Sequence, residues 1–142
     1  MIVVDTNVVS ELMRPEPDAR VLAWWSANAD GLGITAITAE ELLFGAERMP
    51  EGSRRDSIRQ AVERLIEAAE AEGRLLAYGA ECARLDASVR VARERAGRIV
   101  GPEDSMIAAI CLAGGHALAT RNTRHFTDIG LVLHDPWSKG EE

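Results

Sequence analysis

The sequence has few aromatic residues, few cysteines and almost no lysine. Aromatic side chains make up 4% of the 142 residues, so Ala, Leu, Val and Ile must supply most of the core. The two cysteines, Cys82 and Cys111, show neither C-x-x-C nor Cys/His spacing, which argues against a zinc site. Lys139 is the single lysine, so arginine carries nearly all of the positive charge. We expect two buried thiols in a reducing compartment.

Long apolar runs and an excess of positive charge are also missing. No run approaches the roughly 18 residues of a membrane span, and the N-terminus lacks the basic and apolar segments of a signal peptide. We therefore expect a cytoplasmic protein without a membrane partner. The net charge of −7 argues against broad, non-specific binding to nucleic acid. It still allows a nucleic-acid enzyme whose acidic site holds cations.

Short apolar runs alternate with amphipathic segments along the whole chain, which has the length of one domain. The runs predict strands at 1–5, 32–37, 74–78, 116–120 and 131–137. The segments between them predict helices at 6–13, 18–28, 38–49, 53–73, 80–97 and 102–115. This pattern is typical of an α/β fold with a mostly parallel sheet of about five short strands and helices on both faces. We predict a single domain at 1–137 and a C-terminal tail at 138–142.

Polar residues follow several of these strands at the point where each one ends. Asp5 comes directly after the first apolar run, and Glu41 lies in the segment T-A-E-E after the second. Asp104 ends the segment G-P-E-D before a late helix, and Asn122 follows the fourth strand in T-R-N. Ligands of open parallel sheets bind outside the carboxyl ends of the strands. We therefore expect these four side chains to meet at one edge of the sheet.

Each of these residues also has a purely structural interpretation. Asp5 could cap the first helix, and Asn122 could cap a turn. Thr38 and Glu41 match the capping box T-x-x-E, and Asp104 would place negative charge favourably in the first turn of its helix. If the acids are caps alone, replacing Glu41 or Asp104 costs about 1 kcal/mol of stability and no activity.

Several carboxylates at one edge of the sheet would repel one another unless a cation lay between them. A set of Asp and Glu without His or Cys suits Mg²⁺ or Mn²⁺ better than zinc. Such a site can polarise a phosphoryl oxygen and activate water. The residues therefore favour metal-assisted phosphodiester or phosphoryl chemistry.

The order and spacing of several motifs resemble those of PIN-domain ribonucleases. The motifs are MIVVDTNVVSELMRP, ITAEELLFGAERMP, PEDSMIAAICLAGG, LATRNTRHF and LVLHDPW. The sequence is most similar to the VapC toxins of type II toxin–antitoxin modules, in the subgroup of FitB-like and plasmid-stability proteins. This resemblance covers nearly the whole chain. It implies a PIN-like three-layer α/β fold and a Mg²⁺- or Mn²⁺-dependent endoribonuclease that hydrolyses RNA phosphodiester bonds.

The resemblance also implies roles for individual residues. Asp5 and Asp104 would ligate the metal directly, and Glu41 would do so directly or through water; Glu40 is the neighbour with which Glu41 could be confused. The fourth position of the family pattern, often Asp, is Asn122 here, which supplies less charge for a second metal. We therefore expect four catalytic residues and one strong metal site. Residues expected to position water or the scissile phosphate are Thr6, Thr120 and Arg121, with a salt bridge across the acidic edge as the alternative for Arg121.

The resemblance implies partners as well as chemistry. It implies a homodimer, an RNA substrate, a VapB-like antitoxin that binds the toxin, and DNA contacted indirectly through the antitoxin. A second interpretation is a catalytically weak PIN module that acts mainly as the antitoxin-binding partner in a DNA-bound autoregulatory complex. Asn122 supports this alternative, because a binding module has no need to hold a metal.

Overall fold

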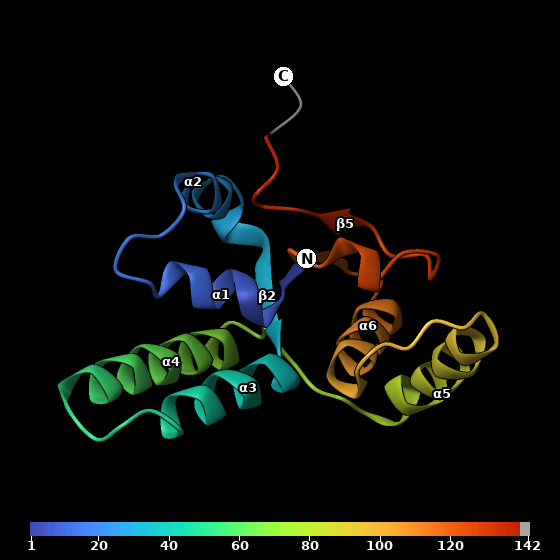
Figure 1. The fold of residues 1–142 in the computed structure, drawn as a ribbon, viewed down its shortest axis with the longest axis horizontal. Helices are drawn as coiled ribbons and strands as arrows, with labels where there is room; N and C mark the ends of the chain where they lie inside the picture. The colour runs from blue at the N-terminus through green and yellow to red at the C-terminus, as the bar shows by residue number, and fades with distance from the viewer. Residues whose placement is uncertain (140–142) are drawn as a thin grey trace.

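The computed structural model describes residues 1–139, so that most of the predicted tail at 138–142 lies outside the described residues. Its strands are β1 (Ile2–Val4), β2 (Leu32–Thr35), β3 (Leu75–Leu76), β4 (Ala117–Ala119) and β5 (Leu133–His134). Its α-helices are α1 (Thr6–Leu12), α2 (Ala19–Asn28), α3 (Ala36–Glu47), α4 (Ser53–Ala71), α5 (Ala80–Arg95) and α6 (Pro102–Gly114). Two short 3₁₀ helices are η1 (Ala29–Gly31) and η2 (Thr123–His125) (Figure 1). Among residues 1–139, no helix is long and apolar enough to cross a membrane.

The five strands form one sheet in the order β3-β2-β1-β4-β5, and every pair of neighbours is parallel. β1, the first strand of the chain, is therefore the central strand. Because parallel strands end at the same edge of a sheet, the residues that follow β1, β2 and β4 are brought to one edge. The prediction of a mostly parallel sheet of about five strands between helices is confirmed.

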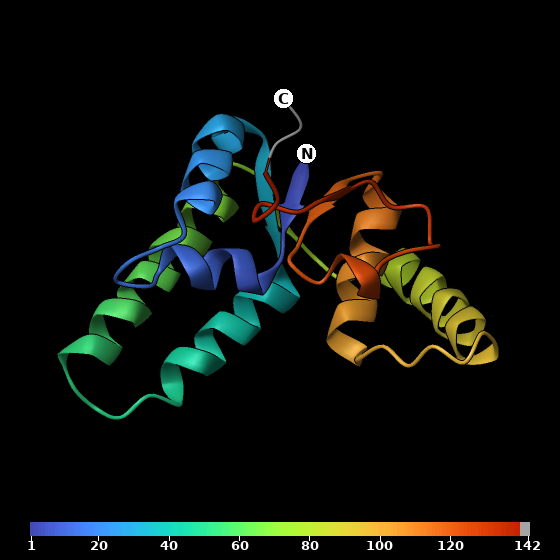
Figure 2. The ribbon, with the colours of Figure 1, turned by 45° about the horizontal axis from the view of Figure 1, so that its top comes forward.

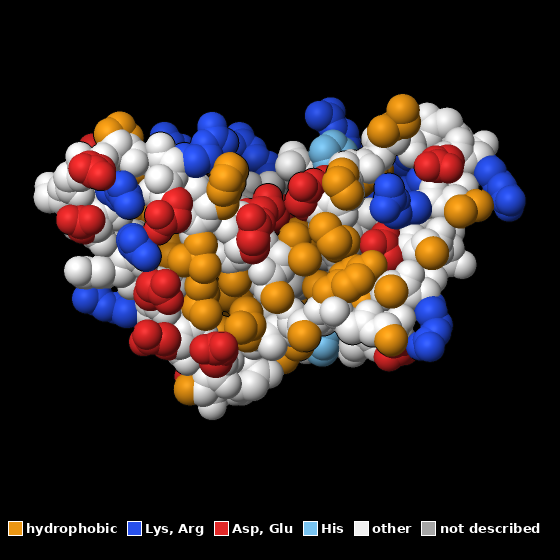
Figure 3. Space-filling model, turned by 90° about the horizontal axis from the view of Figure 1, so that it is seen from below, with side chains coloured by type: hydrophobic (Ala, Val, Ile, Leu, Met, Phe, Trp, Pro, Cys, Tyr) orange, Lys and Arg blue, Asp and Glu red, His pale blue; other side chains and the backbone are white. Residues whose placement is uncertain are grey.

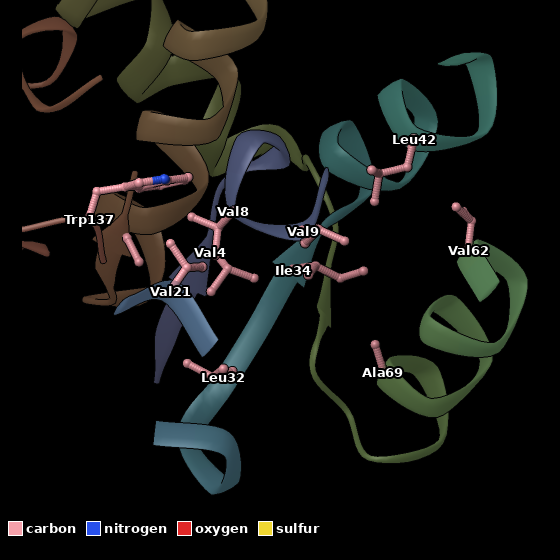
Figure 4. Close-up of a cluster of buried hydrophobic side chains, with 11 residues drawn as sticks. Val4, Val8, Val9, Val21, Leu32, Ile34, Leu42, Val62, Ala69 and Trp137 are labelled. Carbon is pink, nitrogen blue, oxygen red and sulfur yellow. The ribbon is translucent and has the colours of Figure 1, made fainter. Parts of the chain in front are cut away.

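Successive residues of the central strands face opposite layers of helices. Val4 and Ala119 join the larger core cluster, which also takes in side chains of α1, α2, α3 and α4 (Figure 4). Val3 and Leu118 belong to a second cluster, built mainly on α6. This alternation is the period of two that an extended strand imposes on its side chains. It explains why the strands are continuous apolar runs: both faces of the sheet are covered.

Both cysteines lie in the helical layer formed by α5 and α6 and have no disulfide partner. Cys82 and Cys111 are buried, as the sequence predicted. Burial among apolar neighbours raises the pKa of the Cys111 thiol to about 12. The thiol is therefore protonated at neutral pH and unsuited to act as a nucleophile.

Helix α3 begins two residues earlier than the sequence predicted. Its N-cap is Thr35, the last residue of β2, whose Oγ1 accepts a hydrogen bond of 3.0 Å from the backbone N–H of Thr38. The capping box of Thr38 with Glu41 was therefore the wrong interpretation of T-x-x-E. A threonine at the strand end satisfies the helix start, which leaves the side chain of Glu41 available for contacts elsewhere.

Replacing Thr35 by alanine is expected to lower the free energy of unfolding by about 1 kcal/mol, because the Thr38 N–H then loses its acceptor. Thr35→Ser retains the hydroxyl and should lose less. Urea denaturation of the two variants beside the wild type measures the difference. Equal stability of Thr35→Ala and the wild type would contradict this assignment of the helix start.

Candidate active site

A pocket of about 480 Å³ opens at the carboxyl edge of the sheet. Figure 2 shows α1 and α3 on one side of the region where β1 ends, with α6 and η2 on the other. Figure 3, which views the molecule from below, shows acidic side chains near the middle of one face with hydrophobic ones beside them. Predicted site residues that line the pocket are Asp5, Thr6, Glu41, Asp104, Arg121 and Asn122.

Asp5 lies at the base of this pocket and is 4% exposed. It caps α1 through a hydrogen bond of 2.8 Å from the Thr6 N–H to Oδ1. Its Oδ2 accepts a bond of 2.8 Å from the hydroxyl of Thr120, which is itself fully buried at the end of β4. The structural and functional interpretations of Asp5 are thus compatible, since one carboxylate both caps the helix and lines the pocket.

Glu41 reaches the same pocket from α3 and is held there by Thr6. The Thr6 hydroxyl lies 3.0 Å from Glu41 Oε1 and donates a hydrogen bond to it. Glu40, one residue earlier, is exposed and does not line the pocket. The geometry therefore distinguishes the two neighbouring acids, and the one that lines the pocket is Glu41, to which the resemblance assigned the role.

Asp104 enters from the first turn of α6, whose first residue is Pro102. Its Oδ2 lies 2.9 Å from His125 Nδ1, a partner in η2 that the sequence analysis missed. Asn122 precedes η2, and its backbone N–H donates a bond of 3.1 Å to the Thr120 hydroxyl. A histidine 21 positions away carries no local signal of this contact, which arises because η2 lies beside the start of α6.

Arg121 does not form an ion pair within residues 1–139, so the alternative of a salt bridge across the acidic edge is not realised there. Its guanidinium lies over the ring of Trp137, at 5.1 Å from the ring centroid. Such a cation–π contact holds the side chain at the rim of the pocket while leaving its charge uncompensated. Pocket residues that sequence reasoning missed are Asn7, Ser10, Glu11 and Arg14.

The carboxylates of the pocket affect one another electrostatically. Burial raises the pKa of Asp5, the hydrogen bonds from Thr120 and Thr6 oppose that shift, and the charge of Asp104 adds to it. Burial likewise raises the pKa of Glu41, with Asp5 and Asp104 among the like charges that contribute. Within residues 1–139, no Lys or Arg pairs with these three acids. The three acids thus concentrate negative charge that no direct ion pair with Lys or Arg balances, although Arg14 and Arg121 also line the pocket.

These shifts predict how the stability of the metal-free protein depends on pH. A carboxyl group whose pKa is raised by folding stabilises the fold below its unfolded pKa, and this contribution is lost as pH rises through the folded value. We expect the free energy of unfolding to fall above about pH 4 because of Asp5 and Glu41. Urea titrations in EDTA over a pH series measure this slope, and Asp5→Asn should reduce it. An unchanged slope in that variant would contradict the prediction.

The donor chemistry of the pocket fits a hard divalent cation, because the three acids offer oxygen ligands and mutual repulsion that a cation would relieve. They do not form a ready-made site, however. Among the described residues, no three His, Cys, Asp or Glu side chains gather closely enough to hold a metal ion as they stand. Asp104, engaged with His125, is one side chain that would have to change partners.

The fold and the pocket define an α/β protein with an acidic site at the carboxyl edge of a parallel sheet. A sequence profile described as the PIN domain matches residues 2–131, and the chain belongs to the PIN-domain family. VapC ribonuclease Y4jK of Sinorhizobium fredii is 41% identical over 138 residues, which are 96% of this chain and 98% of that protein. Plasmid stability protein StbB of Pseudomonas syringae pv. tomato is also 41% identical, over 96% of this chain and 99% of that protein.

A solved structure of FitAB bound to an IR36 DNA fragment contains a chain with the same fold. It superposes with a TM-score of 0.91 at 30% identity, covering 99% of both chains. Toxin FitB of Neisseria gonorrhoeae is 32% identical over 96% of this chain and 99% of that protein. The chain is thus a VapC-type PIN protein of the group that includes FitB and the plasmid-stability proteins, as its motifs indicated.

Proposed function

We propose that this protein is the endoribonuclease toxin of a VapBC-type toxin–antitoxin module and that it hydrolyses RNA phosphodiester bonds in the pocket described above. The observation that carries the proposal is the meeting of Asp5, Glu41 and Asp104, from three different elements, around one pocket. The family relationship supports the same reaction, because a relative with 41% identity is named a VapC ribonuclease.

The proposal includes Mg²⁺ or Mn²⁺ as cofactor, held by Asp5, Asp104 and Glu41. When bound, such an ion would lower the pKa of a water molecule and polarise the scissile phosphate. Thr6 and Thr120 would keep Glu41 and Asp5 in place, since their hydroxyls already bond these carboxylates. Closing the three acids around one ion requires side-chain rotation, because they do not form a metal site as they stand.

The remaining residues of the pocket would handle substrate and water. Asn122 lines the pocket as an exposed neutral amide, so it can orient water or the scissile phosphate without adding charge. Arg121, at the rim over Trp137, is placed to attract a phosphate entering the pocket. Because Asn122, at the fourth position of the family pattern, is neutral, the proposed metal site has three negative charges. Three charges favour one bound metal ion over two.

Incubation of the purified chain with total cellular RNA tests the proposal directly. We expect discrete cuts with Mg²⁺ or Mn²⁺ and none with EDTA. Addition of either metal should also raise the melting temperature of the RNA-free protein, because a ligand that binds the folded state stabilises it. Cleavage that persists in EDTA would contradict the proposed metal dependence. An absence of cuts with both metals would contradict the proposed nuclease activity.

The proposal also includes partners and a domain assignment. The antitoxin would be a VapB-like protein, with DNA reached through it, and the toxin would act as a homodimer. Relatives solved as FitAB and VapBC complexes with DNA support the antitoxin and DNA parts of this proposal. We assign residues 1–137 to the nuclease domain; Trp137 is buried in the larger core cluster.

A second candidate function is a catalytically weak PIN module that mainly binds the antitoxin in an autoregulatory complex. Two features favour it: Asn122 is neutral, so it adds no charge to hold a metal, and Asp104 is paired with His125. Metal binding separates the two functions. A binding module should show no shift in melting temperature with Mg²⁺ or Mn²⁺ and no cuts in RNA, while a nuclease should show both.

A further inference from the structure

One arginine outside the acidic pocket is buried without enough partners. Arg93, on α5, is 5% exposed, and its Nη2 donates a hydrogen bond of 2.6 Å to the backbone oxygen of His125. Its Nε and Nη1 are buried and have no hydrogen-bond partner. A buried guanidinium with two unpaired donor groups is costly, because its desolvation is not repaid. Such a group is therefore suited to receive an anion.

Arg93 lines a pocket of about 270 Å³ between the C-terminal half of α5, the loop that follows it and the start of α6. Arg90 and Arg98 line the same pocket, and Glu94 is the acid among its lining residues. Arg98 is engaged with Asp128 and with two backbone oxygens, whereas Arg90 has no hydrogen bond or ion pair among the described residues. Burial lowers the pKa of Arg93 and the nearby positive charge of Arg98 adds to the effect, while the charges of Asp104 and Asp86 oppose it.

This arginine pocket lies next to the acidic pocket. Ser105, one of its lining residues, directly follows Asp104 on α6. The oxygen that Arg93 contacts belongs to His125, and the side chain of that histidine contacts Asp104. An anion in the arginine pocket would thus lie close to the acids of the neighbouring pocket. Although the chain has a net charge of −7, three arginines lie together in this pocket beside the acidic pocket.

We propose that the arginine pocket binds a backbone phosphate of the RNA, adjacent to the phosphodiester held by the acidic pocket. The inference rests on the proposed function, since it assigns a second contact to the same substrate. Guanidinium groups match the geometry of phosphate oxygens and bond them in pairs. A phosphate would supply an acceptor for the free charge of Arg90. It would also supply acceptors for the donors that Arg93 leaves unpaired, once the buried guanidinium turns toward the pocket that its side chain lines. The function of this phosphate contact is to position the RNA strand; the contact does not read the base sequence.

The test measures binding rather than cleavage. A fluorescently labelled single-stranded oligouridylate is titrated into the Asp5→Asn chain, which is expected to leave the RNA uncut. The anisotropy is recorded at several salt concentrations. Arg90→Gln and Arg93→Met are introduced into that background. We expect each to weaken binding by roughly tenfold. The slope of log affinity against log salt should also fall by about 0.7 for each lost phosphate contact.

Arg84→Gln is the matched control, because Arg84 is exposed on the same helix and does not line the pocket. It should leave both the affinity and the salt slope near those of the parent. Thermal melting checks that Arg93→Met is folded, and the exposed Arg90 carries the test if it is not. Equal losses in all three variants would overturn the inference, since they would report net charge alone. RNA binding that is unchanged in Arg90→Gln and Arg93→Met would also overturn the inference. If the same two variants bind an acidic peptide more weakly than the parent, the pocket binds a protein partner instead.

Measuring the cleavage of cellular RNA by the wild-type chain distinguishes a failure of this inference from a failure of the proposed function. Cuts together with oligouridylate binding that is independent of Arg90 and Arg93 would overturn the phosphate pocket and leave the nuclease intact. Binding that depends on these arginines, without any metal-dependent cuts, would overturn the nuclease and support the pocket as an RNA contact.

Discussion

Asp5→Asn is expected to abolish RNA cleavage while leaving the fold intact. The change removes the charge of the most buried acid of the pocket. The amide oxygen of the asparagine can still cap α1 at the Thr6 N–H, and its NH₂ group can donate to the Thr120 hydroxyl, which now acts as the acceptor. Changes in the outer shell of metal sites already cost about 10- to 100-fold, so loss of a direct ligand should cost more than about 100-fold. The rate of cleavage of total RNA at saturating Mg²⁺ measures the loss.

Circular dichroism and urea denaturation provide the control for this variant. Its metal-free form should be at least as stable as the wild type at neutral pH, because a buried charge with a raised pKa has been removed. Asp30→Asn, at an exposed acid outside the pocket, is the matched substitution and should cleave normally. Full activity of Asp5→Asn would contradict the assignment of the acidic pocket as the active site.

Glu41→Gln and Glu40→Gln are expected to behave differently although the two residues are adjacent. Glu41 lines the pocket and accepts a bond from Thr6, so loss of its charge should lower the cleavage rate by at least about tenfold. Glu40 is exposed and away from the pocket, so Glu40→Gln should retain wild-type activity. The two variants have the same net charge, which removes general electrostatic effects from the comparison.

The same pair tests whether these acids are mere helix caps. Thr35 caps α3, so Glu41→Gln should not lower the free energy of unfolding of the metal-free protein. A loss of about 1 kcal/mol with normal cleavage would indicate that Glu41 is structural. A loss of activity in Glu40→Gln instead would place the second acid of the site one residue earlier.

The strands and helices could be predicted because their signals are local. MIVV is a continuous apolar run, and such a run is stable where both faces of a strand are covered. Pro102 and the glycines at 114 and 115 mark the ends of α6, where the structure also has them. The start of α3 was predicted two residues late, because Thr35 and Thr38 are both good caps and the sequence does not show which hydroxyl meets a free N–H.

The sequence by itself determined the α/β class, the parallel sheet and the acids that follow its strands, because periodicity and strand ends are properties of neighbouring residues. The tertiary structure decided which residues meet. Strand order placed β1 beside both β2 and β4, and this brought Thr120 onto Asp5 and Thr6 onto Glu41. The pairing of Asp104 with His125 and the burial of Arg93 depend on η2 lying against α5 and α6. Contacts between residues far apart in the chain arise from packing, and no local pattern encodes them.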